Sequence, residues 1–247
     1  MSATTAPAIY ALDLGPQPVS SLSLLRDEAL DEQLSGAVVA GSIVAFAPGV
    51  SEQHRQDVMQ SLLLAQLAAN AKAERQKDPV AWFQAYRGVL EQAAWVIEAS
   101  SAATRYLPQV STFSVSTVVD DVLRPKLLAE ELAFIATILN AFRSDTNGTA
   151  QLVFECPSHS GGIGNFQVAL AAEEGGTLSL RLAQISFNTP QHVIRLMLEQ
   201  FAKAAQFRTA FLALNLNEDV YARLRSSIAS KLEGRMPGAV ALIQLPA

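Results

Sequence analysis

The chain of 247 residues contains one cysteine and three histidines. Because Cys156 is the only thiol, an internal disulfide and a zinc site built on cysteines are both excluded, which fits a reducing compartment. His54, His159 and His192 lie far apart in the sequence, and no pair has the spacing of a metal site. The sequence therefore predicts no bound metal, and the histidines are expected in polar loops or on the surface.

Basic segments are also missing. Lys and Arg total 18 against 23 Asp and Glu, the formal net charge is −5, and no stretch is dense in Lys or Arg. A nucleic-acid partner requires a basic face that neutralises phosphates. No nucleic-acid partner is therefore expected. An anionic membrane is repelled on average, although a local basic face would escape that average.

Long hydrophobic runs and a signal peptide are absent too. Residues 1–10 lack the basic and then apolar pattern of a signal peptide. The most apolar stretches, 61–69 and 132–141, are shorter than the roughly 20 residues that cross a bilayer as a helix. The sequence predicts a soluble protein made in the cytoplasm, and any release would use lysis or a dedicated machine.

What the chain does contain is apolar residues. Half of its residues are hydrophobic, 17% are charged and the mean hydropathy is +0.21, which excludes disorder. A large, well-filled core explains this composition, and the alternative is a protein that also handles a lipid, a membrane or a partner. At this length one core is expected, with an extended leader over residues 1–17 and a single domain over residues 18–247.

Hydrophobic periodicity predicts long amphipathic helices followed by strands. Ser51 and Asp78 are the expected N-caps of two helices joined by a short turn, and the second helix carries one apolar stripe from Trp82 to Ile97. The alternation over 178–187 slips in phase, which indicates a β-bulge. Because helices and strands do not alternate strictly, the predicted fold class is α/β of the α+β type, with an antiparallel or mixed sheet covered by helices. The predicted helices cover 19–34, 51–77, 79–100, 125–142, 189–206 and 217–233, and the predicted strands cover 42–47, 110–119, 151–154, 166–172, 178–187, 209–214 and 240–245.

The motifs that usually carry chemistry have plainer explanations here. The Gly-rich segment 160–165 precedes a strand rather than a helix, so it is predicted to be a hairpin turn and not a phosphate loop. Ser158 and Ser160 flank a histidine but lack a nucleophile elbow. The carboxylate pairs 120–121 and 130–131 point about 100° apart on a helix, as on a solvated face. No catalytic or nucleotide-binding residue is predicted.

Cys156 is the one candidate site residue. It follows the predicted strand 151–154 and precedes Pro157, so an inert, half-buried thiol is one interpretation. The alternative is lipidation, in which a thioester-linked fatty acid gains roughly 0.8 kcal/mol for each buried CH₂ group. The polar Ser158 to Ser160 segment places the thiol near a solvent-facing loop and argues against this alternative. A covalent fatty acid is the only cofactor that the sequence leaves open.

The segment from Trp82 to Glu91 (WFQAYRGVLE), followed by Trp95, Val96 and Ile97, resembles a motif of the family of the Erwinia virulence factor Evf. Segments 164–168 and 214–221 are similar to the same pattern, and Ala94 stands where glycine is expected. The resemblance implies an α/β domain of complex topology, a link to virulence and a palmitoylated cysteine, which the motif does not align with Cys156. The length and the order of elements are also similar to those of the Cyt-type cytolytic toxins.

Together these observations predict a non-enzymatic, virulence- or toxin-associated protein that engages lipid or membrane, with acylation at Cys156 as an option. A structural or interaction protein that assembles into larger particles is the alternative, so a homo-oligomer stays open. An enzyme whose site is dispersed in the sequence is a third hypothesis.

Overall fold

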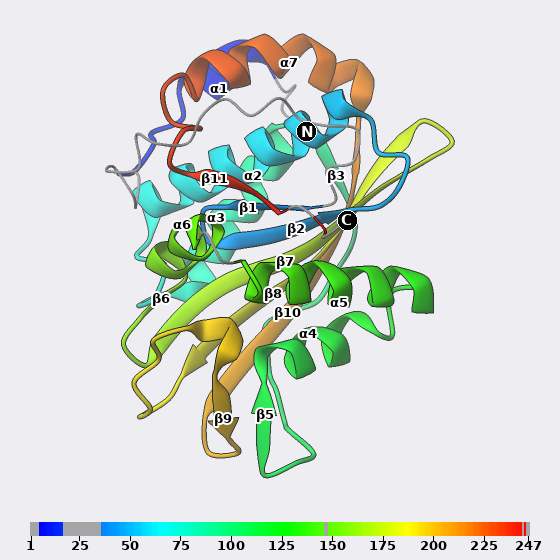
Figure 1. The fold of residues 1–247 in the computed structure, drawn as a ribbon. Helices are drawn as coiled ribbons and strands as arrows, with labels where there is room; N and C mark the ends of the chain where they lie inside the picture. The colour runs from blue at the N-terminus through cyan, green and yellow to red at the C-terminus, as the bar shows by residue number, and fades with distance from the viewer. Residues whose placement is uncertain (1–4, 17–35, 146–147, 244, 246–247) are drawn as a thin grey trace.

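A mixed β-sheet lies at the centre of the structure, and helices cover both of its faces (Figure 1). The computed structural model describes residues 5–16, 36–145, 148–243 and 245. The helix predicted over 19–34 lies outside the described residues. The observed architecture confirms the α+β fold class.

The sheet contains long central strands and short edge strands. Its members are β1 (Gly36–Val39), β2 (Ser42–Phe46), β3 (Trp95–Ser100), β4 (Thr104–Arg105), β6 (His159–Ser160), β7 (Ile163–Glu174), β8 (Thr177–Asn188), β10 (Gln206–Leu216) and β11 (Val240–Ile243). The strand order is β11-β1-β2-β7-β8-β10-β3, with β4 beside β10 and β6 beside β7. Strands β2 and β7 pair in parallel, and the neighbouring pairs are antiparallel. A separate pair, β5 (Thr112–Ser114) and β9 (Gln200–Ala202), forms a small sheet.

Each face of the sheet has its own hydrophobic core. One face is covered by α1 (Ala6–Tyr10), α2 (Glu52–Lys72), α3 (Pro79–Gln92) and α7 (Glu218–Lys231). The other face is covered by α4 (Val115–Leu123), α5 (Ala129–Arg143), α6 (Thr149–Ser158) and the short 3₁₀ helix η1 (Leu196–Leu198). Within the described part of the chain, no helix has both the length and the apolar character needed to span a membrane.

The predicted helix starts are confirmed. The side chains of Ser51, Asp78 and Asn217 accept hydrogen bonds from backbone N–H groups three residues later, at the starts of α2, α3 and α7. Such caps satisfy N–H groups that have no partner inside the helix. The part of the apolar stripe that lies on α3 packs as predicted, since Trp82, Tyr86, Val89 and Leu90 are fully buried, but its predicted continuation at Val96 is wrong, because Val96 lies on β3 and is 54% exposed.

The predicted bulge in β8 is wrong. The pairing of β7 with β8 runs without a register shift from Ile163 opposite Asn188 to Glu174 opposite Thr177. The apolar alternation changes phase in β8 because helices cover both faces of this strand, so that apolar side chains are buried on either face. Leu180 and Leu182 enter the core under α2 and α3, whereas Ile185 and Phe187 enter the core under α4 to α6.

Several segments adopt a secondary structure other than the predicted one. Helix α3 ends at Gln92 rather than near Ser100, and the chain turns through Ala94, whose φ of 65° is a conformation that glycine adopts without strain. The residues after this turn form β3. The leader is not simply extended, because α1 buries Ile9. The predicted strands 110–119 and 151–154 largely form α4 and α6, and the predicted helix 189–206 forms η1 and β9.

Candidate functional site

Cys156 lies on helix α6 rather than after a strand, and its side chain is exposed. Leu152, one helical turn before it, is 59% exposed. Val153 and Phe154 point the other way and are fully buried. Because residues i and i+4 share a helix face, the thiol and Leu152 form the outer surface of α6. A fatty acid on Cys156 would therefore begin at the protein surface and not between the apolar walls of the core.

Helix α6 contacts the loop that precedes β9. A carboxylate oxygen of Glu155 accepts a hydrogen bond from the Leu196 N–H at 3.1 Å, and the same oxygen lies 2.7 Å from His159 Nε2. The Val193 N–H also donates to the Gly161 carbonyl oxygen at 3.3 Å. The outer surface of α6 thus continues into residues 192–199.

Two loops flank the small β5–β9 sheet, at the bottom of the molecule in Figure 1. These loops are residues 106–111 and residues 192–199, and the Lys203 N–H donates to the Ser111 carbonyl oxygen at 2.9 Å beside them. We call this surface, together with β4 and the adjoining end of β10, the β5–β9 pole. Its exposed large apolar side chains are Leu107 (66% exposed), Val110 (52%), Ile194 (70%) and Leu198 (42%).

The β5–β9 pole also has a charge opposite to that of the whole chain. Residues 104–114, 192–203 and 206–209 contain four Lys or Arg against one Glu, a net charge of +3, while the chain carries −5. Arg105 and Arg208 are register partners on β4 and β10, and neither has a carboxylate partner among the described residues. The cationic side chains of the pole are all exposed: Arg105, Arg195, Lys203 and Arg208.

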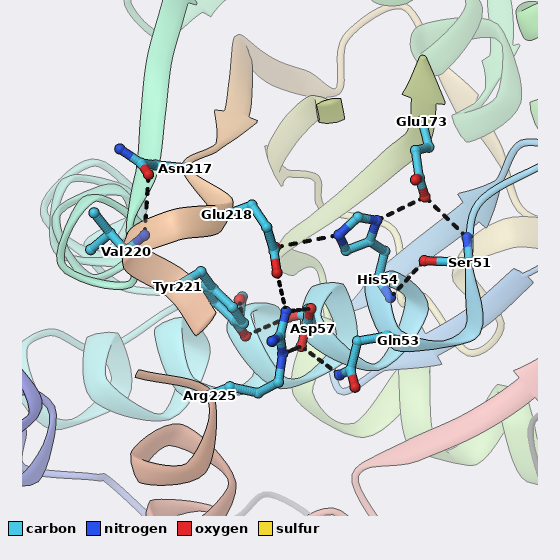
Figure 2. Close-up of polar contacts among 11 residues, drawn as sticks. Ser51, Gln53, His54, Asp57, Glu173, Asn217, Glu218, Val220, Tyr221 and Arg225 are labelled. Atoms are coloured by element: carbon cyan, nitrogen blue, oxygen red, sulfur yellow. Dashed lines mark hydrogen bonds and ion pairs between the residues drawn. The ribbon is translucent and has the colours of Figure 1, made fainter. Parts of the chain in front are cut away.

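A second polar feature lies near the start of α7, at the end of the molecule away from the β5–β9 pole (Figure 1). Figure 2 shows His54 between two carboxylates. His54 Nδ1 lies 2.7 Å from Glu173 Oε2, and Nε2 lies 3.3 Å from Glu218 Oε2. Partial burial would raise the pKa of Glu173, but hydrogen bonds from His54 and the Ser51 N–H lower it below its ordinary value.

The same cluster holds a buried carboxylate. Asp57 is fully buried, and Arg225 binds it through two hydrogen bonds of 2.9 and 2.8 Å while donating a third, of 2.7 Å, to Glu218 Oε1. Gln53 donates to Asp57 Oδ1 at 3.0 Å. The hydrogen bonds that Arg225 donates to the Asp57 and Glu218 carboxylates raise its pKa and keep it charged. These contacts join α2, α7 and the end of β7.

The structure corrects the expected placement of two histidines. His192 is exposed as predicted, but the side chains of His54 and His159 are only 13% and 9% exposed, and each is paired with a carboxylate. His159 contacts Glu155, and its ring makes no hydrogen bond to a serine in the part of the chain that the structure describes. The spacing of His54 and Asp57 on one helix was visible in the sequence, but their proximity to Glu218 was not. The 160–165 segment is the predicted hairpin turn, between β6 and β7.

Comparisons with known proteins give matches in structure alone. No family model and no curated protein sequence matches the chain. The Evf virulence factor matches with 11% identity and a TM-score of 0.37, over 85% of this chain and 86% of that chain. A delta-endotoxin matches with 14% identity and a TM-score of 0.35, over 72% and 84% of the two chains.

Activated Cyt2Ba from Bacillus thuringiensis subsp. israelensis also matches, with 14% identity and a TM-score of 0.29, over 52% of this chain and 77% of that chain. The structural neighbours are thus the proteins that the motif and the order of elements resemble. At these identities and TM-scores they carry no conclusion about activity, and the function proposed below rests on the surface of this chain.

Proposed function

We propose that this chain is a non-enzymatic, virulence- or toxin-associated protein that engages an anionic lipid surface through the β5–β9 pole. The lipid-binding part of the proposal rests on one observation, which is that the β5–β9 pole is both apolar and positively charged. Exposed large apolar side chains and a net charge of +3 occur together on a chain whose total charge is −5. The association with virulence or toxicity is what the sequence resemblance implies.

Both properties favour a peripheral position at the lipid headgroups. Each Lys or Arg near an anionic membrane surface contributes about 1 kcal/mol. Leu107 and Ile194 are exposed on the loops that precede β5 and β9, at opposite ends of this antiparallel pair, and their insertion would remove apolar area from water at about 25 cal/mol per Å². A neutral lipid surface would supply only the second contribution, so anionic lipid is the favoured partner.

Acylation of Cys156 is the finer form of this proposal. The cysteine sulfur would take an acyl group from an acyl-thioester donor, and the donor thiol would leave with the cysteine proton. A single acyl chain gives only marginal membrane binding, so stable anchoring takes a second signal. The β5–β9 pole would provide that signal, because residues 192–199 lie directly beside α6.

Vesicle co-sedimentation tests the proposal. We expect the protein to bind vesicles of phosphatidylserine and phosphatidylcholine more tightly than vesicles of phosphatidylcholine alone. The double variant Leu107→Ser, Ile194→Ser should bind at least about tenfold more weakly, which is a free-energy loss of about 1.4 kcal/mol. The matched control Val96→Ser changes a 54% exposed valine on β3 and should bind like the parent chain.

If the protein does not bind vesicles, or if the double variant and the control lose vesicle affinity equally, the β5–β9 pole is not the lipid-binding surface. Native mass measurement separates the proposal from the alternative of self-assembly. A lipid-free protein that forms multiples of 26.4 kDa, and loses them in the double variant, would show that the same apolar side chains join copies of the chain.

A further inference from the structure

The His54 cluster has an unbalanced charge. In its centre three carboxylates, Glu173, Asp57 and Glu218, face one guanidinium, Arg225, and one imidazole (Figure 2). With a neutral imidazole the sum is −2, and with a protonated imidazole it is −1. Arg225 compensates the fully buried Asp57, so the excess negative charge lies on Glu173 and Glu218, whose side chains are 20% and 44% exposed. A divalent cation would bring the group with neutral His54 to zero.

The geometry around His54 indicates where such a cation would sit. Glu173 lies 2.7 Å from Nδ1, and a carboxylate there holds the proton on Nδ1 and leaves a lone pair on Nε2. Nε2 lies 3.3 Å from Glu218 Oε2, so two electron pairs face each other unless a proton or a metal ion lies between them. Tetrahedral zinc sites with bonds of 2.0–2.1 Å to nitrogen and oxygen place neighbouring ligand atoms about 3.3 Å apart.

A third ligand is already in reach. His54, Asp57 and Glu218 each offer one ligand atom, and these atoms all lie within 4.8 Å of one another. Arg225 and Gln53 donate hydrogen bonds to the Asp57 carboxylate, which is how second-shell groups orient a metal ligand. Each carboxylate oxygen has two lone pairs, so Asp57 can keep these hydrogen bonds and still bind a metal.

From this geometry we propose that His54, Asp57 and Glu218 form a binding site for a divalent transition metal, with Zn²⁺ as the best match. One imidazole nitrogen and two carboxylate oxygens leave the fourth tetrahedral position to water. Glu173 acts as the second-shell carboxylate of His54. The site is independent of the β5–β9 pole and revises the expectation of no metal, which rested on sequence spacing alone. Bound metal would join α2 to α7, 164 residues apart.

Titration calorimetry of the full chain with Zn²⁺ tests the site. One equivalent of Zn²⁺ should bind, and the melting temperature should rise with it. His54→Gln, which removes a ligand, should abolish this binding, and Glu173→Gln should weaken it about 10–100-fold as a second-shell change. The matched control is His159→Gln, because His159 also contacts a glutamate at 2.7 Å but has no second carboxylate partner among the described residues.

A second readout keeps the test independent of stability. Co²⁺ in place of Zn²⁺ should give the visible absorption of a tetrahedral site, and Glu218→Gln, which changes a 44% exposed side chain, should remove it in a protein with an unchanged circular dichroism spectrum. Binding that survives His54→Gln but is lost in His159→Gln would place the metal elsewhere. No stoichiometric binding of either ion would overturn the proposal and leave a proton as the occupant between His54 and Glu218.

Discussion

At the scale of single residues, Arg75 is a buried cation held by several hydrogen bonds in the core under α2 and α3. It is 5% exposed and has no carboxylate partner among the residues that the structure describes; instead it donates to the Gly41, Asn165, Gln66 and Gln167 oxygens. Burial lowers its pKa to about 9. A Cβ atom at Gly41 would lie 2.3 Å from Arg75 Nη2, so this hydrogen-bonded cation requires glycine at that position.

Trp82 belongs to the same core and gives a prediction for stability. Its ring lies 4.4 Å from the Arg75 guanidinium and stacks on Tyr86 at 5.2 Å, while its Nε1–H donates to Asn70 Oδ1 at 2.7 Å. Trp82→Ala should lower the free energy of unfolding by about 3–5 kcal/mol, as large aromatic truncations in cores do. Urea denaturation measures this change. The control Gln84→Ala, at an exposed position of the same helix, should stay within about 0.5 kcal/mol of the parent.

At the scale of elements, α4 and α6 show where local sequence patterns mislead. Both segments contain Val, and α6 also contains Phe154, residues that favour strands, yet each segment forms a helix that buries one apolar side against the sheet. Ser114 and Thr117 form a capping box that begins α4. Because of the helix in place of a strand, Cys156 and Leu152 share one exposed face of α6.

The exposed position of Cys156 gives a chemical prediction. Protein isolated from its native host should have an intact mass above that of the unmodified chain by the mass of one acyl group, and hydroxylamine, which cleaves thioesters, should remove the excess. The variant Cys156→Ser should have no excess mass, since it lacks the only thiol. An unmodified mass from the native host would remove acylation and leave lipid binding to the β5–β9 pole alone.

At the scale of the whole molecule, the distribution of charge matters more than its sum. The chain carries −5, yet the β5–β9 pole carries +3, and the His54 cluster with its excess of carboxylates lies at the other end (Figure 1). The protein therefore has a charge asymmetry that would orient it at an anionic surface, since summed charge distributions steer association beyond individual contacts.

This asymmetry predicts a salt-dependent interaction. Binding to phosphatidylserine vesicles should weaken steeply between about 0.1 M and 1 M salt, because the Debye length falls from about 10 Å to about 3 Å. The double variant Arg105→Gln, Arg208→Gln removes two cations of the pole that have no carboxylate partner among the described residues. It should bind more weakly at low salt and respond less to added salt. Binding by the parent chain that is indifferent to salt would contradict an electrostatic role for the pole.

Local physical rules in the sequence determined much of the fold. Helix starts at Ser51, Asp78 and Asn217, the buried stripe of α3, and strands β2, β7, β8 and β10 all follow from capping groups and apolar periodicity within short windows. The lipidation candidate, Cys156, could also be named from the sequence, because the chain has a single cysteine.

Only the tertiary structure decided the rest. Residues 95–97 continue an apolar stripe along the chain, but they form β3 because the turn at Ala94 brings them beside β10. The β5–β9 pole joins segments 104–114 and 192–209, and the His54 cluster joins α2 to α7. No local pattern encodes such contacts, because strand pairing and side-chain contacts between distant segments depend on how the whole chain packs.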